Sequence, residues 1–199
     1  MLAFDTKVVK SIRMTDWSGA PKLDAREEHF RVEGPREGLS LFLRFLPAAS
    51  GLKPPCAVLY VHGATFPSAL SVAYRFDGRS WRDALCEAGF DVWGLDFYGF
   101  GHSDRYAEMD QPALDNPPLC QAADAAKQLE AGVRFILAHQ AIAKLSLIAH
   151  SFGSMPAGLF AGAHPALIDR LVLFAPISRR TPCGYERPTK FPAWRHRDA

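Results

Sequence analysis

The chain has 199 residues, of which 48% are apolar and 22% are charged. This balance excludes a disordered chain and a membrane-embedded one, and the length suffices for one domain with a sizeable core. The net charge of +2 is unevenly placed: residues 178–199 carry six Lys/Arg against two Asp/Glu, which leaves 17 against 19 for residues 1–177. The main body is therefore no basic nucleic-acid binder.

The cysteines and the N-terminus indicate the compartment. The four cysteines form no C-x-x-C pair, which argues against a zinc site or a disulfide framework and favours a reducing environment. Asp5 stands where a signal peptide needs an apolar core, and no apolar run reaches the ~18 residues of a transmembrane helix. We therefore expect a cytoplasmic protein with no metal, no cofactor, no membrane contact and no nucleic-acid partner.

The first regular structure expected is a pair of short antiparallel strands. Glu28–Glu33 and Leu39–Leu46 flank a turn that contains Gly and Pro. After the breaker Lys53-Pro54-Pro55, the segment Cys56–Val61 is continuously apolar, which is typical of a strand buried on both faces. His62-Gly63 ends this strand.

Beyond this point the pattern alternates between helix and strand. We expect helices over residues 79–88, 119–139 and 152–164, and strands over residues 90–96, 144–149 and 170–175. Such units build an α/β fold, a mostly parallel sheet with right-handed crossovers and helices on both faces. The periodicity ends past Pro176, so residues 1–177 are expected to form the domain and residues 178–199 an irregular, Pro-rich basic tail.

Ser151 lies where a predicted strand runs directly into a predicted helix, in the stretch Ala149-His150-Ser151-Phe152-Gly153. A Ser with small residues two positions before and after it is typical of a nucleophile elbow, a turn so tight that the Ser backbone is strained. The helix N-terminus favours the anion that forms during acyl transfer. An ordinary strand-to-helix turn with a capping Ser is the alternative interpretation.

Three motifs in this order and spacing resemble the α/β-hydrolase fold enzymes over nearly the whole chain. They are His62-Gly63, the Gly-rich stretch from Asp96 to Ser103, and the elbow at Ser151. The sequence departs from the family at Ala149, where most members have Gly, although a methyl group is small enough for the elbow. The resemblance implies an esterase, lipase-like or serine aminopeptidase-like hydrolase.

The same resemblance implies roles for individual residues. Ser151 would be the nucleophile, and the backbone N–H groups of Phe152 and Ala64 would form the oxyanion hole. The aromatic residues Phe66 and Trp81, and likewise Tyr98 and Phe152, are candidates for an acyl or aromatic pocket, although aromatic side chains usually belong to the core.

The acid and the base are harder to place. In this fold they follow the nucleophile in the order Ser, Asp or Glu, then His. His164 and Asp169 follow Ser151, but they connect a helix to the next strand and therefore belong to the opposite edge of the sheet. Glu186 and His196 have the right order and remain as an improvised acid and base, against the alternative of a solvated tail.

The resemblance also implies missing parts. In relatives a lid follows the sixth strand, and two further strands supply the acid and the base. Phe174–Ile177 resembles the end of the sixth strand, so the chain is expected to be a hydrolase fold that lacks its lid and C-terminal strands.

Three functions follow as hypotheses. The first is a serine hydrolase that acts on a small-molecule carboxylic ester or amide through an acyl-enzyme on Ser151. The second is a catalytically inactive truncated remnant or a binding module, which an uncovered strand at the sheet edge would make prone to self-association. The third is the binding of an anionic partner by the basic tail.

Overall fold

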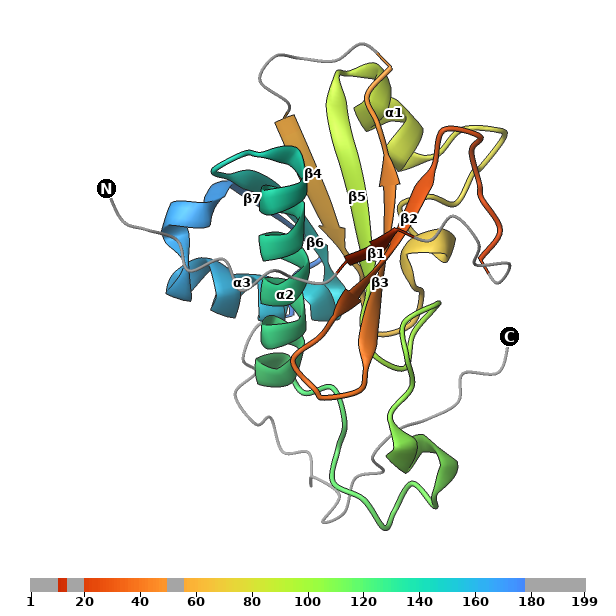
Figure 1. Cartoon of the computed structure of the whole chain (residues 1–199), viewed down its shortest axis with the longest axis vertical. Helices are drawn as coiled ribbons and strands as arrows, with labels where there is room; N and C mark the ends of the chain where they lie inside the picture. The colour runs from red at the N-terminus through yellow and green to blue at the C-terminus, as the bar shows by residue number, and fades with distance from the viewer. Residues whose placement is uncertain (1–10, 14–19, 50–55, 178–199) are drawn as a thin grey trace.

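The computed structural model describes residues 11–13, 20–49 and 56–177. They contain one seven-stranded sheet in the order β1-β2-β3-β5-β4-β6-β7 (Figure 1). The strands are β1 (Ser11–Arg13), β2 (Glu28–Glu33), β3 (Ser40–Leu46), β4 (Cys56–Val61), β5 (Phe90–Asp96), β6 (Leu145–His150) and β7 (Ile168–Phe174). The helices are α1 (Trp81–Glu87), α2 (Ala122–Gln140) and α3 (Ser154–Ala163), with short 3-10 turns η1 (Ser68–Leu70), η2 (Ala107–Asp110), η3 (Ser151–Gly153) and η4 (Pro165–Leu167).

The sheet combines a parallel half with an antiparallel edge. β5, β4, β6 and β7 run parallel to one another, whereas β1, β2 and β3 pair antiparallel and join the parallel half through β3 and β5. This confirms the antiparallel pair, the parallel sheet and the six strands that the sequence predicts. The additional strand β1 was not predicted, because three residues are too short to show an alternating pattern.

Alternation along each strand places helices on both faces of the sheet, as predicted. On β5, the side chains of Trp93 and Leu95 belong to the main core cluster, which also contains buried apolar side chains of α2 such as Leu129 and Ile136. The intervening Val92 faces the other way and packs with Leu46 and with Cys86 of α1. Both faces of the central strands are therefore covered, which explains the continuous apolar run of β4.

The ends of α1 and α2 follow from local chemistry. Ser80 caps α1 through a reciprocal pair of hydrogen bonds with Asp83, so the helix begins at Trp81 rather than at the predicted Arg79. α2 begins at Ala122 rather than at Leu119, because Cys120 has a φ of 50° and no helix continues through such a residue.

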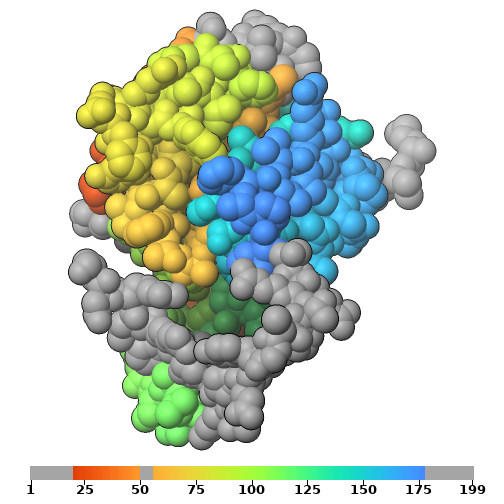
Figure 2. Space-filling view, turned by 180° about the vertical axis from the view of Figure 1, so that it is seen from behind, coloured from red at the N-terminus to blue at the C-terminus, as the bar shows by residue number. Residues whose placement is uncertain are grey.

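The strand β7 exposes apolar side chains at one edge of the described sheet. Within the described residues β7 pairs only with β6, and its Val172 and Phe174 are each 51% exposed. Figure 2 shows the blue surface of β7 and α3 beside the gold surface of the segment that follows β4. The described part of the chain contains no helix that is long and apolar enough to cross a membrane.

Candidate active site

Three parallel strands bring the predicted motifs to one edge of the sheet. β4 lies between β5 and β6 and is parallel to both, so the residues that follow these strands meet at the same edge. His62 follows β4, Phe97 follows β5 and Ser151 follows β6. Active sites of open parallel sheets form at this carboxyl edge.

The backbone at Ser151 has the geometry of a nucleophile elbow. Ser151 has a φ of 50°, a left-handed conformation that costs a residue with a Cβ roughly 1–2 kcal/mol. The residue is half-buried and directly joins β6 to η3. The strain predicted for this Ser is confirmed, and such strain is held only where the surrounding packing fixes it.

Small residues around Ser151 allow neighbouring backbone to approach it. A Cβ at Gly153 would lie 2.5 Å from the carbonyl oxygen of His62 and 2.6 Å from that of Val61, so only glycine fits. A Cβ at Gly63 would lie 3.2 Å from Cβ of Ser151. Ala149 is fully buried, and its methyl group is accommodated as expected.

His62 anchors the start of the loop and is not available as a base. Its Nδ1 lies 2.6 Å from the carbonyl oxygen of Gly63, and its Nε2 accepts a hydrogen bond of 3.1 Å from the backbone N–H of Phe97. Complete burial lowers the pKa of His62, although the charge of Asp96 acts in the opposite direction. The ring is therefore neutral and holds the end of β4 to the end of β5.

Asp96 organises the Gly-rich turn rather than offering a free carboxylate. Its Oδ1 accepts a hydrogen bond of 2.7 Å from the N–H of Ser68, and its Oδ2 accepts one of 3.1 Å from the N–H of His102. Gly101 has a φ of 51°, and a Cβ there would lie 2.0 Å from Oδ2 of Asp96. The turn therefore requires glycine at this position.

A groove of about 710 Å³ opens beside Ser151. Its wall includes Gly63 and Ala64 next to Ser151, and it includes the predicted pocket residues Phe66 and Trp81. The groove therefore joins the elbow to the predicted oxyanion loop, and most of its remaining wall is aromatic or apolar. The contribution of the Ala64 and Phe152 N–H groups to an oxyanion hole stays a prediction.

The other two predicted pocket residues lie elsewhere. Tyr98 is only 1% exposed and packs edge-on against Tyr106 in the core, so its assignment to the pocket was wrong. Phe152 packs against the core at Phe97 and is not part of the groove wall. Burial of an aromatic ring cannot be distinguished from pocket lining by residue type alone.

The structure separates the candidate acids and bases. Ile168 pairs with Leu145 at the start of β6, so His164 and Asp169 lie at the edge opposite Ser151, as predicted. His164 pairs there with Glu130 of α2 at 3.5 Å. The other predicted pair, Glu186 and His196, lies outside the described residues, as does the whole predicted tail.

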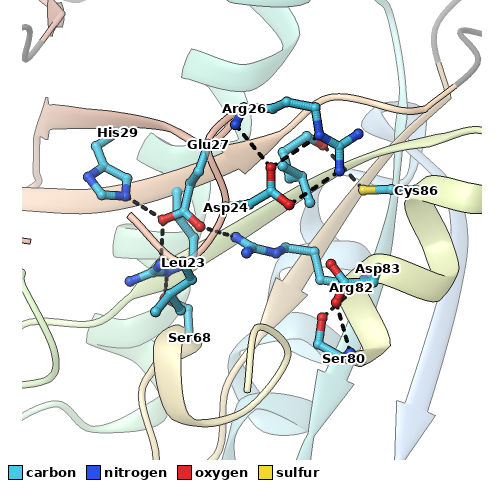
Figure 3. A network of polar contacts seen from close by, with 12 residues as sticks. Leu23, Asp24, Arg26, Glu27, His29, Ser68, Ser80, Arg82, Asp83 and Cys86 are labelled. Atoms are coloured by element: carbon cyan, nitrogen blue, oxygen red, sulfur yellow. Dashed lines mark hydrogen bonds and ion pairs between the residues drawn. The ribbon is translucent and has the colours of Figure 1, made fainter. Parts of the chain in front are cut away.

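Two kinds of side-chain cluster complete the description of the site: clusters that could bind a metal, and buried charges. Among the described residues no cluster of three or more His, Cys, Asp or Glu side chains has the arrangement of a metal site. The sequence interpretation missed a buried charge cluster in which Glu27 pairs with Arg44 and Arg82. Figure 3 shows Glu27 beside Arg82 and His29. The sequence contained a signal for this cluster, because Arg44 interrupts the apolar residues that follow Ser40 in β3.

Comparisons with known proteins agree with this architecture. The chain is 32% identical over 133 residues to epoxide hydrolase 4 of Mus musculus, an alignment that covers 66% of the chain and 31% of that relative. An epoxide hydrolase from Vigna radiata has a TM-score of 0.55 at 18% identity, covering 79% of the chain and 42% of that structure. A thermophilic esterase from Thermogutta terrifontis has a TM-score of 0.55 at 21% identity, covering 77% of the chain and 47% of that structure.

These relatives are longer than the chain, which spans between 31% and 47% of their lengths. The structural matches are below a quarter in identity and show the fold. The family described as alpha/beta hydrolase fold matches residues 57–197, which include the loop after β4, the Gly-rich turn and the elbow. The chain therefore belongs to the alpha/beta hydrolase fold family.

Proposed function

We propose that the chain carries the nucleophile of a serine hydrolase that cleaves carboxylic ester or amide bonds of small molecules. The observation that supports this most directly is Ser151, held at a φ of 50° in an elbow that opens into the groove. Ser151 attacks the substrate carbonyl carbon and forms an acyl-enzyme, which water then hydrolyses. The N–H groups of Ala64 and Phe152 donate hydrogen bonds to the oxyanion.

The nucleophile favours an ester over an epoxide, although two of the relatives are epoxide hydrolases by name. Attack of a Ser hydroxyl on a carbonyl gives an ester, which water cleaves in the second step. Attack on an epoxide carbon would give an alkyl ether, which water does not cleave under mild conditions. Attack on one epoxide molecule would therefore leave the Ser permanently alkylated, without turnover.

The hydroxyl proton of Ser151 requires a base. Glu186 and His196 are the acid and base that this chain offers in the required order. We include them in the proposal, with His196 accepting the proton and Glu186 orienting the imidazole.

A second candidate function is a binding module without catalysis. It is favoured by the placement of His164 at the opposite edge and by the neutral, hydrogen-bonded state of His62. Neither of these two histidines is available to Ser151 as a base.

Covalent labelling separates the two functions. Purified chain is treated with a fluorophosphonate probe and with a short-chain chromogenic ester, beside Ser151→Ala, His196→Ala and the control His164→Ala. Labelling and turnover that disappear in Ser151→Ala and persist in His164→Ala support the hydrolase. Loss in His196→Ala identifies the base, whereas no labelling of folded wild-type chain favours the binding module.

A further inference from the structure

Glu27 is the centre of a buried ionic cluster that joins three elements. Its carboxylate accepts a hydrogen bond of 2.6 Å from Nη1 of Arg44 on β3, and it also pairs with Nη1 of Arg82 on α1. His29 of β2 contacts the same carboxylate (Figure 3). Glu27 is 0% exposed, and Arg44 and Arg82 are each 1% exposed.

The surroundings of Glu27 favour its ionised form. Burial raises the pKa of Glu27, but the hydrogen bond from His29 and the charges of Arg44 and Arg82 outweigh it, so the pKa is lowered. Glu27 is therefore ionised and fixes the guanidinium of Arg44 in place.

Arg44 also binds the loop that follows β4. Its Nε donates a hydrogen bond of 2.8 Å to the hydroxyl of Ser68, whose own N–H donates to Asp96. Gly94 leaves room for the Arg44–Ser68 contact, because a Cβ there would lie 2.9 Å from Cβ of Ser68 and 3.1 Å from Cγ of Arg44. Ser68 is fully buried.

The loop is thus held at both ends. His62 binds its start to the end of β5, and Ser68 binds its end to Arg44 and to Asp96. Between these anchors lie the exposed Ala64 and Gly63, where a Cβ would lie 3.2 Å from Cβ of Ser151. The position of the Ala64 N–H therefore depends on both anchors.

Stability alone does not explain this arrangement. Buried ion pairs often stabilise a fold no more than apolar residues of similar volume, because the charges lose their hydration. β3 is apolar on either side of Arg44, and apolar residues in place of the whole cluster of Glu27, Arg44 and Arg82 would avoid the cost of desolvating three charges. Such a replacement would, however, remove the hydrogen bond that Arg44 donates to the hydroxyl of Ser68.

We propose that Arg44 and Ser68 are positioning residues that hold the loop 62–68 in the geometry required for oxyanion stabilisation. The inference rests on the proposed hydrolase function for its catalytic consequence. Its structural part, the fixed loop, does not depend on catalysis.

The test uses Ser68→Ala, Arg44→Met and the conservative Arg44→Lys. Arg134→Met, which removes an exposed arginine of α2, is the matched control. Hydrogen–deuterium exchange is measured for peptides that cover residues 62–70, with peptides of β5 and β6 as internal references. Inactivation by the fluorophosphonate is resolved into the binding constant KI and the rate constant kinact.

We expect exchange in the loop to become about fivefold to tenfold faster in Ser68→Ala and Arg44→Met, with partial recovery in Arg44→Lys and no change in Arg134→Met. The rate constant kinact is expected to fall about tenfold or more at unchanged KI, because the loop positions a donor and does not bind the probe. Unchanged loop exchange and unchanged kinact in folded Ser68→Ala would overturn the inference.

The test still gives an answer if Arg44→Met does not fold or if the wild-type chain is not labelled. If Arg44→Met does not fold, Ser68→Ala carries the test, since it removes only the hydroxyl that Arg44 binds. If the wild-type chain is not labelled, the proposed hydrolase function fails. Loop exchange then decides alone, with faster exchange supporting the anchor and unchanged exchange refuting it.

Discussion

Gly153→Ala is the sharpest test of the elbow, because the added atom meets only backbone. Its Cβ would lie 2.5 Å and 2.6 Å from the carbonyl oxygens of His62 and Val61, so relief of the clash requires a shift of the end of β4 or of the turn after β6. Overpacking of this kind costs about 3 kcal/mol, at the upper end of the usual range. The reduced entropy of the unfolded chain returns up to about 1 kcal/mol. The expected net loss is about 2 kcal/mol.

The control lies on the helix that follows. Gly158 is in α3, and a Cβ there would have no heavy atom within 4 Å, so Gly158→Ala is expected to gain about 0.5–1 kcal/mol. In thermal unfolding followed by circular dichroism, Gly153→Ala is expected to melt about 4–8 °C below wild type. If the two variants were equally stable, the close approach of β4 to the elbow would be refuted.

Three further predictions concern Ser151, the charge cluster and the sheet edge. Ser151→Gly is expected to exceed Ser151→Ala in unfolding free energy by about 1 kcal/mol in urea titrations, because only glycine accepts a φ of 50° without strain; equal values would contradict the strain. Glu27→Gln is expected to lower the unfolding free energy at pH 7 by about 3–5 kcal/mol, because two buried arginines lose their carboxylate. The folded-state pKa of Glu27 lies below the unfolded value of 4.5, so the stabilisation is present above pH 4.5 and is lost as the pH falls through the folded-state pKa. A difference that does not shrink in acid unfolding curves would argue against an ionised Glu27. Val172→Lys on β7 is expected to reduce self-association in sedimentation velocity more than Leu114→Lys, a loop change at similar exposure (51% and 53%); equal effects would show that the edge strand is not the contact.

The strands of the parallel half were predictable almost to the residue. Cys56–Val61 is a continuous apolar run after Pro55, and Phe90–Asp96 is a mainly apolar segment after Gly89; the structure gives both strands the predicted bounds. These strands are buried on both faces, so local pattern and tertiary burial agree. Helix starts were less accurate, because a single backbone conformation at Cys120 decides where α2 begins.

The candidate site was predictable only where its geometry is local. The elbow depends on Ala149, Ser151 and Gly153 within five consecutive positions, and its neighbours in the sheet follow from the parallel order. The charge cluster joins Glu27 to Arg44 and Arg82, which lie 17 and 55 positions further along the chain. No periodicity encodes such a pairing, although a lone arginine in an apolar strand requires a buried partner.

The positive φ angles separate structural turns from the site. Asp77 adopts such an angle with Gly78 in a two-residue turn, where Phe76 and Arg79 exchange backbone hydrogen bonds, and Ala141 adopts one at the C-terminus of α2. Both are positions where left-handed backbone is common. Ser151 has no such explanation, because it passes directly from β6 into a helical turn and carries a hydroxyl where glycine would relieve the strain. Strained backbone of this kind clusters at functional sites, and Ser151 also lines the groove. These two observations together make the Ser151 hydroxyl the group on which the functional proposal rests.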